Sequence, residues 1–154
     1  MHDRESTSSP RSLPARLARY RSQALRLQES AHIAMQRGQW SQAEDLIWGS
    51  LVAASRGVAL WYGEDAGDDA RLKEFVRRVG EEEKDRYIRD AFDHLSALAE
   101  AAERVRERRT RVDYLILAMD DLDEGIDRLV ARLPGGDNGL PSTDPDDDVA
   151  DFGA

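Results

Sequence analysis

One segment of this chain combines residue types that could do chemistry. Arg89 and Asp90 are followed, after three spacers, by His94. A histidine titrates near neutral pH, so it can take a proton from a ribose 2′-hydroxyl or give one to a leaving oxygen. An arginine can stabilise the negative charge that develops on a phosphate. The segment fits metal-independent cleavage of RNA, and it equally fits an exposed arginine beside a partly buried histidine.

A regular helix does not bring these two side chains together by itself. Five residues turn an α-helix by about 500°, which leaves Arg89 and His94 about 140° apart around the axis. They could meet at one phosphate through a bent helix start, the reach of arginine, or a dimer partner. Chance is the alternative origin of the pattern, because the chain holds twenty arginines and three histidines.

The charge of the chain is unevenly distributed. The net charge is −9 over 154 residues, and six of the negative charges are aspartates of residues 134–154, a segment without a basic residue. The balance therefore does not indicate a bulk nucleic-acid binder. Residues 1–11 and the acidic residues 134–154 are both expected to be disordered, which leaves 12–133 for one domain.

Arginines nevertheless cluster in two places, residues 11–37 and residues 103–111. Arginine outnumbers lysine twenty to two, which suits forked contacts to phosphate. A solvated helix face is the alternative explanation. The arginines expected to contact RNA, a nucleotide or a partner protein are Arg21, Arg26, Arg56, Arg104, Arg108 and Arg109.

Other classes of site have little support. The chain has no cysteine, which excludes disulfides, thiolate nucleophiles and cysteine-bound zinc. Asp120, Asp123 and Asp127 share a helix face, but no histidine joins them, so we expect a solvated face or a partner for arginines rather than a metal site. His32 is expected to be structural, and no cofactor is indicated. No apolar run reaches membrane-spanning length and no signal-peptide core is present, so we expect a cytoplasmic protein without a membrane partner.

Helical periodicity dominates the chain, and strand alternation is absent. The pattern predicts four long helices, over about 12–37, 41–62, 81–105 and 112–133, and a short one over 69–79. Gly38, Gly63 and Gly80 are expected to end helices, and Ser41 with Glu44 forms a capping box. The last helix has an unbroken heptad seam. Its members are Val112, Leu115, Met119, Leu122, Ile126, Leu129 and Leu133. An all-α, up-down bundle is the simplest packing.

Small residues recur every four positions in the second predicted helix, at Gly49, Ala53 and Gly57. Glycine inside a helix costs about 1 kcal/mol relative to alanine, so a benefit should offset it. We expect the close approach of another helix, within the bundle or across a homodimer. A ligand groove over the bare backbone is the alternative.

Residues 38–49 read GQWSQAEDLIWG, and Arg56 follows seven positions after Gly49. This segment resembles the HEPN superfamily (higher eukaryote and prokaryote nucleotide-binding), and most closely its small archaeal-type branch, over about residues 16–133. Asp45, Trp48, Gly49 and Arg56 stand at matching places. The chain departs from that branch at Asp69 and at Leu98-Ala99, where the branch tends to have histidines. The resemblance implies a helical bundle that commonly dimerises, and in many members a metal-independent ribonuclease with an Arg-x4–6-His motif, which Arg89 and His94 match.

The sequence therefore leaves three functions open. The preferred one is a dimeric binding or interaction module, whose arginine-rich helices contact RNA, a nucleotide or a partner protein. The alternative is a toxin-like, metal-independent endoribonuclease, in which Arg89 binds the scissile phosphate and His94 transfers protons. The third is a structural homodimer, assembled through the Gly49-Ala53-Gly57 face or the last helix.

Overall fold

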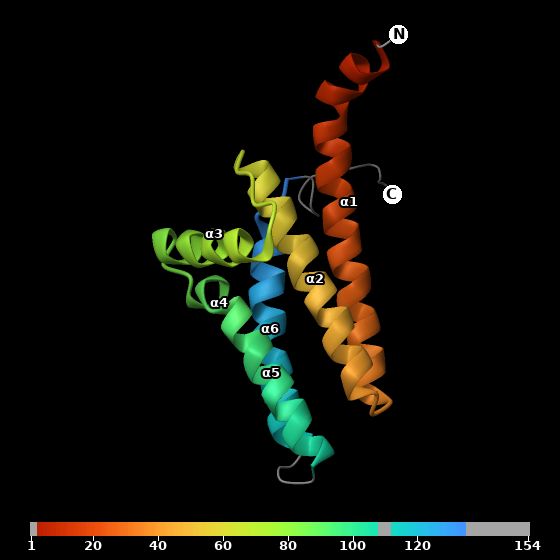
Figure 1. Ribbon diagram of the computed structural model, residues 1–154, viewed down its shortest axis with the longest axis vertical. Coiled ribbons are helices and arrows are strands. Elements are labelled where there is room, and N and C mark those ends of the chain that lie inside the picture. Colours follow the sequence, from red (N-terminus) through yellow and green to blue (C-terminus); the bar gives the residue numbers. More distant parts are fainter. Residues whose placement is uncertain (1–2, 108–111, 135–154) are drawn as a thin grey trace, which may run out of the picture.

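The computed structural model describes residues 3–107 and 112–134, which fold into six α-helices and contain no strand. The all-α prediction is confirmed. The four long helices pair as two antiparallel hairpins, α1 with α2 and α5 with α6, while α3 runs across their direction (Figure 1). The helices are α1 (Asp3–Gln36), α2 (Trp40–Trp61), α3 (Asp69–Glu82), α4 (Arg86–Arg89), α5 (Ala91–Arg106) and α6 (Val112–Ala131).

The first helix begins at Asp3, before the start predicted at Ser12. It therefore includes residues 3–11, for which the sequence predicted disorder. Proline lacks a backbone N–H and bends a helix when it lies inside one. Pro10 and Pro14 both fall in the first part of α1, which is bent in Figure 1.

The turn between α1 and α2 depends on Gly38, as predicted. Gly38 has a φ of +73°, in the left-handed region that favours glycine. The N–H of Gln39 donates to the carbonyl of Ala34 at 2.9 Å, and that of Gly38 donates to Met35 at 3.1 Å. These bonds close a Schellman-type turn, so the second helix follows α1 almost at once.

The capping box predicted at Ser41 is wrong. The tight turn places the start of α2 at Trp40, with Gln39 as the N-cap and no side-chain cap. Ser41 and Glu44 instead contact Arg106 at the end of α5. Its Nη1 donates to the Ser41 hydroxyl at 3.0 Å and lies 3.7 Å from the Glu44 carboxylate. These residues therefore join the two hairpins rather than cap a helix.

The predicted boundary at Gly80 is also wrong. Gly80 lies inside α3, which continues to Glu82. A Cβ at this position would collide with the backbone of Arg89, so the glycine allows α3 to touch the end of α4. The helix predicted to start at Glu81 is replaced by a turn at Lys84 (φ +57°) and by two helices that meet at Asp90.

The heptad seam predicted for the last helix lies in the core. Six of the seven members of the heptad seam are buried, and only Val112 is exposed, at 41%. The seam packs within the bundle against α5 and α2. Buried side chains of α1, α2, α3 and α5, with Ile88 of α4, complete the core.

Candidate functional site

Arg89, Asp90 and His94 lie around the break between α4 and α5. Arg89 is the last residue of α4, Asp90 lies between the helices, and His94 is in the first turn of α5. Nε and Nη2 of Arg89 donate to the two carboxylate oxygens of Asp90, both at 2.8 Å. This bidentate pair lowers the pKa of Asp90 and raises the pKa of Arg89.

His94 makes no such bond. Its side chain is half-buried, its Nδ1 is enclosed and has no hydrogen-bond partner, and its ring centroid lies 6.5 Å from that of Tyr87. Among the residues that the structure describes, no hydrogen bond or ion pair joins His94 to Arg89. A phosphate held by Arg89 would have to compete with Asp90 for the guanidinium.

The α4 segment is anchored to α6. Asp85 accepts from two backbone N–H groups at the start of α4 and from Nη1 of Arg128 at 3.2 Å. The guanidinium of Arg128 also lies over the ring of Tyr87, 4.8 Å from its centroid. These contacts fix the helix break at Asp90 relative to the rest of the bundle.

A histidine–carboxylate pair joins α1 to α6. Nε2 of His32 lies 2.7 Å from Oδ2 of Asp123, and Gln28 donates to Asp123 at 3.0 Å and to Asp127 at 3.1 Å. Burial raises the pKa of Asp123, although the hydrogen bonds from His32 and Gln28 oppose this.

The sequence contained a signal for this pair. Gln28 and His32 are four residues apart on one helix, as are Asp123 and Asp127 on another, so each pair presents two side chains on one face. Periodicity did not show that these two faces meet. Within the described residues, Asp123 and Asp127 of the acidic face contact Gln28 and His32, whereas Asp120 is exposed. In the described part of the chain, no group of three or more His, Cys, Asp or Glu side chains could hold a metal.

The structure does not bring the predicted arginines together in one contact site. Arg21 lines a cavity beside the end of α2, whereas Arg56 lines another and donates to the carbonyl of Ala66 at 3.3 Å. Arg26 is exposed on α1, and Arg104 is exposed in the last turn of α5. Arg108 and Arg109 lie outside the described residues.

The small-residue face of α2 packs within the bundle. A Cβ at Gly49 would lie 3.1 Å from Leu27, and one at Gly57 would lie 3.1 Å from Tyr20 and 3.2 Å from Leu133. Ala53, between them, is 4% exposed. The close helix approach is therefore made by α1 of the same chain, and this face is not open to a second copy.

An exposed apolar surface lies at the start of α6 instead. Four large apolar side chains there are exposed by 41% to 60%, and we call them together the α6 apolar surface. Its members are Val112 (41%), Tyr114 (60%), Ile116 (47%) and Leu117 (59%). At helical spacing they form two neighbouring pairs, Val112 with Ile116 and Tyr114 with Leu117. The heptad seam predicted only one apolar face for this helix, because it accounted for the periodicity of the apolar residues.

No family model, no curated protein and no solved structure matches this chain. Within the described residues, no helix has both the length and the apolar character needed to span a membrane.

Proposed function

We propose that this protein is a helical protein–protein interaction module that forms a homodimer through the α6 apolar surface. The observation that supports the proposal is the exposure of Tyr114 and Leu117, at 60% and 59%. They are three residues apart, so they lie next to each other on the helix surface. Contiguous exposed apolar side chains mark sites of association, and aromatic residues are enriched in such interfaces.

A second copy of the chain is the partner that the other observations favour. The symmetric alternative, the Gly49-Ala53-Gly57 face, is filled by α1 of the same chain. The resemblance to HEPN proteins, which commonly dimerise, remains a prediction and favours the same partner. In a two-fold dimer the same patch is used twice, so one exposed apolar helix face can cover itself.

The test compares solution mass across three proteins. The wild type should be a dimer by light scattering after size exclusion, and the double variant Tyr114→Asp, Leu117→Asp should be a monomer with an unchanged helical circular-dichroism spectrum. Ile33→Asp is the matched control, because Ile33 is 42% exposed but lies on α1. A wild type that stays monomeric at micromolar concentration contradicts the proposal.

The second candidate function is the metal-independent ribonuclease. One structural observation favours it: the helix is interrupted at Asp90. The angle of about 140° around the axis, which a continuous helix would place between Arg89 and His94, therefore does not apply. RNA incubated with the protein in EDTA should then yield 2′,3′-cyclic phosphate ends. Arg89→Ala and His94→Ala should abolish cleavage, whereas His32→Ala should not. Equal cleavage by all these proteins would exclude the pair.

A further inference from the structure

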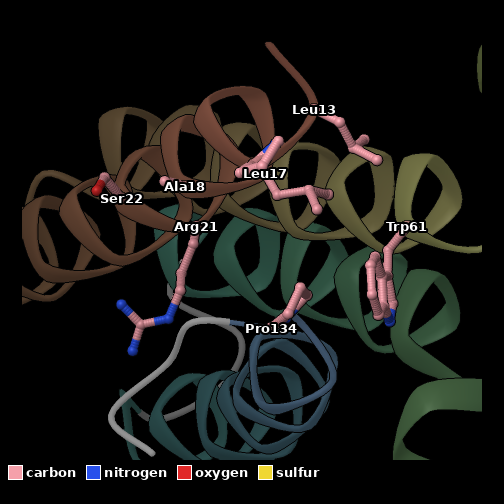
Figure 2. A pocket seen from close by; sticks show the side chains of 8 residues that line it. Leu13, Leu17, Ala18, Arg21, Ser22, Trp61 and Pro134 are labelled. Atoms are coloured by element: carbon pink, nitrogen blue, oxygen red, sulfur yellow. The ribbon is translucent and has the colours of Figure 1, made fainter. Parts of the chain in front are cut away.

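A cavity of about 350 Å³ lies between the first half of α1, the end of α2 and Pro134, which follows α6 (Figure 2). Two large apolar side chains that line it are exposed, Trp61 at 46% and Leu13 at 38%. Figure 2 shows both of them, with Leu17, on one side of Pro134. This end of the bundle therefore presents an apolar hollow that water would have to fill. The remaining lining residues are Pro14, Ala18, Arg21 and Ser22.

The chain continues directly from this cavity. Residues 135–154 follow Pro134 and lie outside the described residues. They include three large apolar residues, Leu140, Val149 and Phe152, of which Phe152 is the one aromatic. A segment tethered beside a site has an effective concentration there on the order of millimolar, so even a weak contact is largely formed.

The cavity wall and this segment carry opposite charges. Between residues 12 and 28, α1 has four arginines and no acidic residue, whereas residues 135–154 have six aspartates and no basic residue. Because α1 forms one wall of the cavity, its positive potential favours an acidic segment at that place. The attraction arises from the summed charge of this part of the helix rather than from any single arginine.

We propose that residues 149–152 of the same chain dock in this cavity, with the ring of Phe152 against the indole of Trp61. A phenyl ring buries more apolar surface than Leu140 or Val149 would, and aromatic rings pair favourably edge to face or offset. The preceding aspartates then lie near α1. Docking covers Trp61 and Leu13, so the segment is an intramolecular cover for an apolar surface, and its release exposes that surface.

A nitroxide beside Phe152 tests the docking in the full chain. The sequence has no cysteine, so Gly153→Cys provides one labelling position. The NMR signal of the Trp61 indole N–H, identified by its loss in Trp61→Phe, should be strongly broadened by the label. In the labelled chain, Phe152→Ala should lower the docking equilibrium constant about tenfold or more, because one large apolar side chain no longer fills the cavity, and the signal should return. Leu140→Ala is the matched control and should leave the signal broadened.

Two alanines of α1 test the cavity from the other side. Ala18 lines the cavity and is exposed, whereas Ala15 is exposed and does not line it. In the labelled chain, Ala18→Phe should release the segment and restore the Trp61 signal, and Ala15→Phe should not.

Three results would overturn the proposal. The first is a Trp61 signal that the label does not broaden. The second is an equal effect of Phe152→Ala and Leu140→Ala, or of Ala18→Phe and Ala15→Phe, because the contact would then lack the specificity of a docked ring. The third is broadening in isotope-labelled chains without nitroxide when they are mixed with nitroxide-labelled chains, because the occupant would then come from a second copy.

Discussion

The contact between Gly80 and Arg89 predicts that replacing Gly80 with alanine destabilises the protein. In most helix interiors, replacing glycine with alanine stabilises a protein by about 1 kcal/mol. At Gly80 the added methyl group would collide with the backbone N and Cα of Arg89. Backbone atoms cannot move aside as the tip of a side chain can, so α3 and α4 must separate.

Overpacking of this kind typically costs about 1–3 kcal/mol, and occasionally more. Because a backbone must shift here, we expect the cost to lie at the upper end and to exceed the helix-propensity gain. The net loss of unfolding free energy for Gly80→Ala should be about 2 kcal/mol. At about 2–4 °C per kcal/mol for a domain of this size, the melting temperature should fall by about 4–8 °C.

Gly49→Ala is the matched control for this measurement. Gly49 is also inside a helix, but a Cβ there meets only the Cδ1 atom of Leu27, at 3.1 Å. That methyl group is the end of a flexible side chain, so the melting temperature should change little or rise. Thermal unfolding followed by circular dichroism compares the two variants directly. If Gly80→Ala is as stable as the wild type, the packing of α3 on α4 is not as close as described.

Three further variants test other contacts of the bundle, at Gly57, Asp123 and Arg89. Gly57→Leu should lower the melting temperature rather than dissociate a dimer, because its side chain would meet α1; a monomer of unchanged stability would contradict this. Burial raises the pKa of Asp123, so the folded state binds its proton more readily than the unfolded state. This carboxyl therefore favours folding most at pH below its unfolded pKa, and that contribution is lost as pH rises through its folded pKa. Asp123→Asn should consequently be at least as stable as the wild type at pH 7 in thermal scans; a large loss would mean that the pair with His32 outweighs desolvation. Arg89→Gln should leave the midpoint of urea unfolding almost unchanged, because its pair with Asp90 is solvent-exposed. The contribution of that pair is lost only as pH falls through the lowered pKa of Asp90.

Where a helix forms was largely predictable from the sequence, because burial repeats with the period of the helix. The heptad seam of α6 and the stop at Gly38 depend on residues close together in the chain. The role of Gly80 depends on contact with Arg89, which no local pattern reveals. Glycine often ends a helix, but Gly80 lies inside α3 and allows this helix to touch α4.

The candidate sites were less predictable for the same reason. Periodicity put Arg89, Asp90 and His94 on one predicted helix, whereas the structure has a helix break at Asp90. His32 and Asp123 were each identified and given separate explanations, since their pairing requires that α1 and α6 lie side by side. The α6 apolar surface was not predicted, because the heptad seam already explained the apolar residues of this helix.

The proposed dimer surface and the candidate ribonuclease residues lie at opposite ends of the α5–α6 hairpin. His94 lies in the first turn of this helix, and the helix ends at Arg106, next in the chain to the segment that leads into α6. Twelve residues of α-helix span about 18 Å. A dimer axis through the α6 apolar surface therefore lies near the end of α5 that is remote from His94 (Figure 1).

Because the α6 apolar surface lies far from His94, loss of the dimer should not by itself remove a ribonuclease activity. If the protein cleaves RNA with Arg89 and His94 of one chain, the monomeric variant Tyr114→Asp, Leu117→Asp should keep the cleavage rate per chain. The measurement is the rate of RNA cleavage in EDTA for wild type and variant, with solution mass checked in the same buffer. Loss of cleavage together with the dimer, in a variant that keeps its helical spectrum and melting temperature, would show that the active arrangement needs two chains. The α6 apolar surface would then be part of the catalytic assembly rather than a separate site of association.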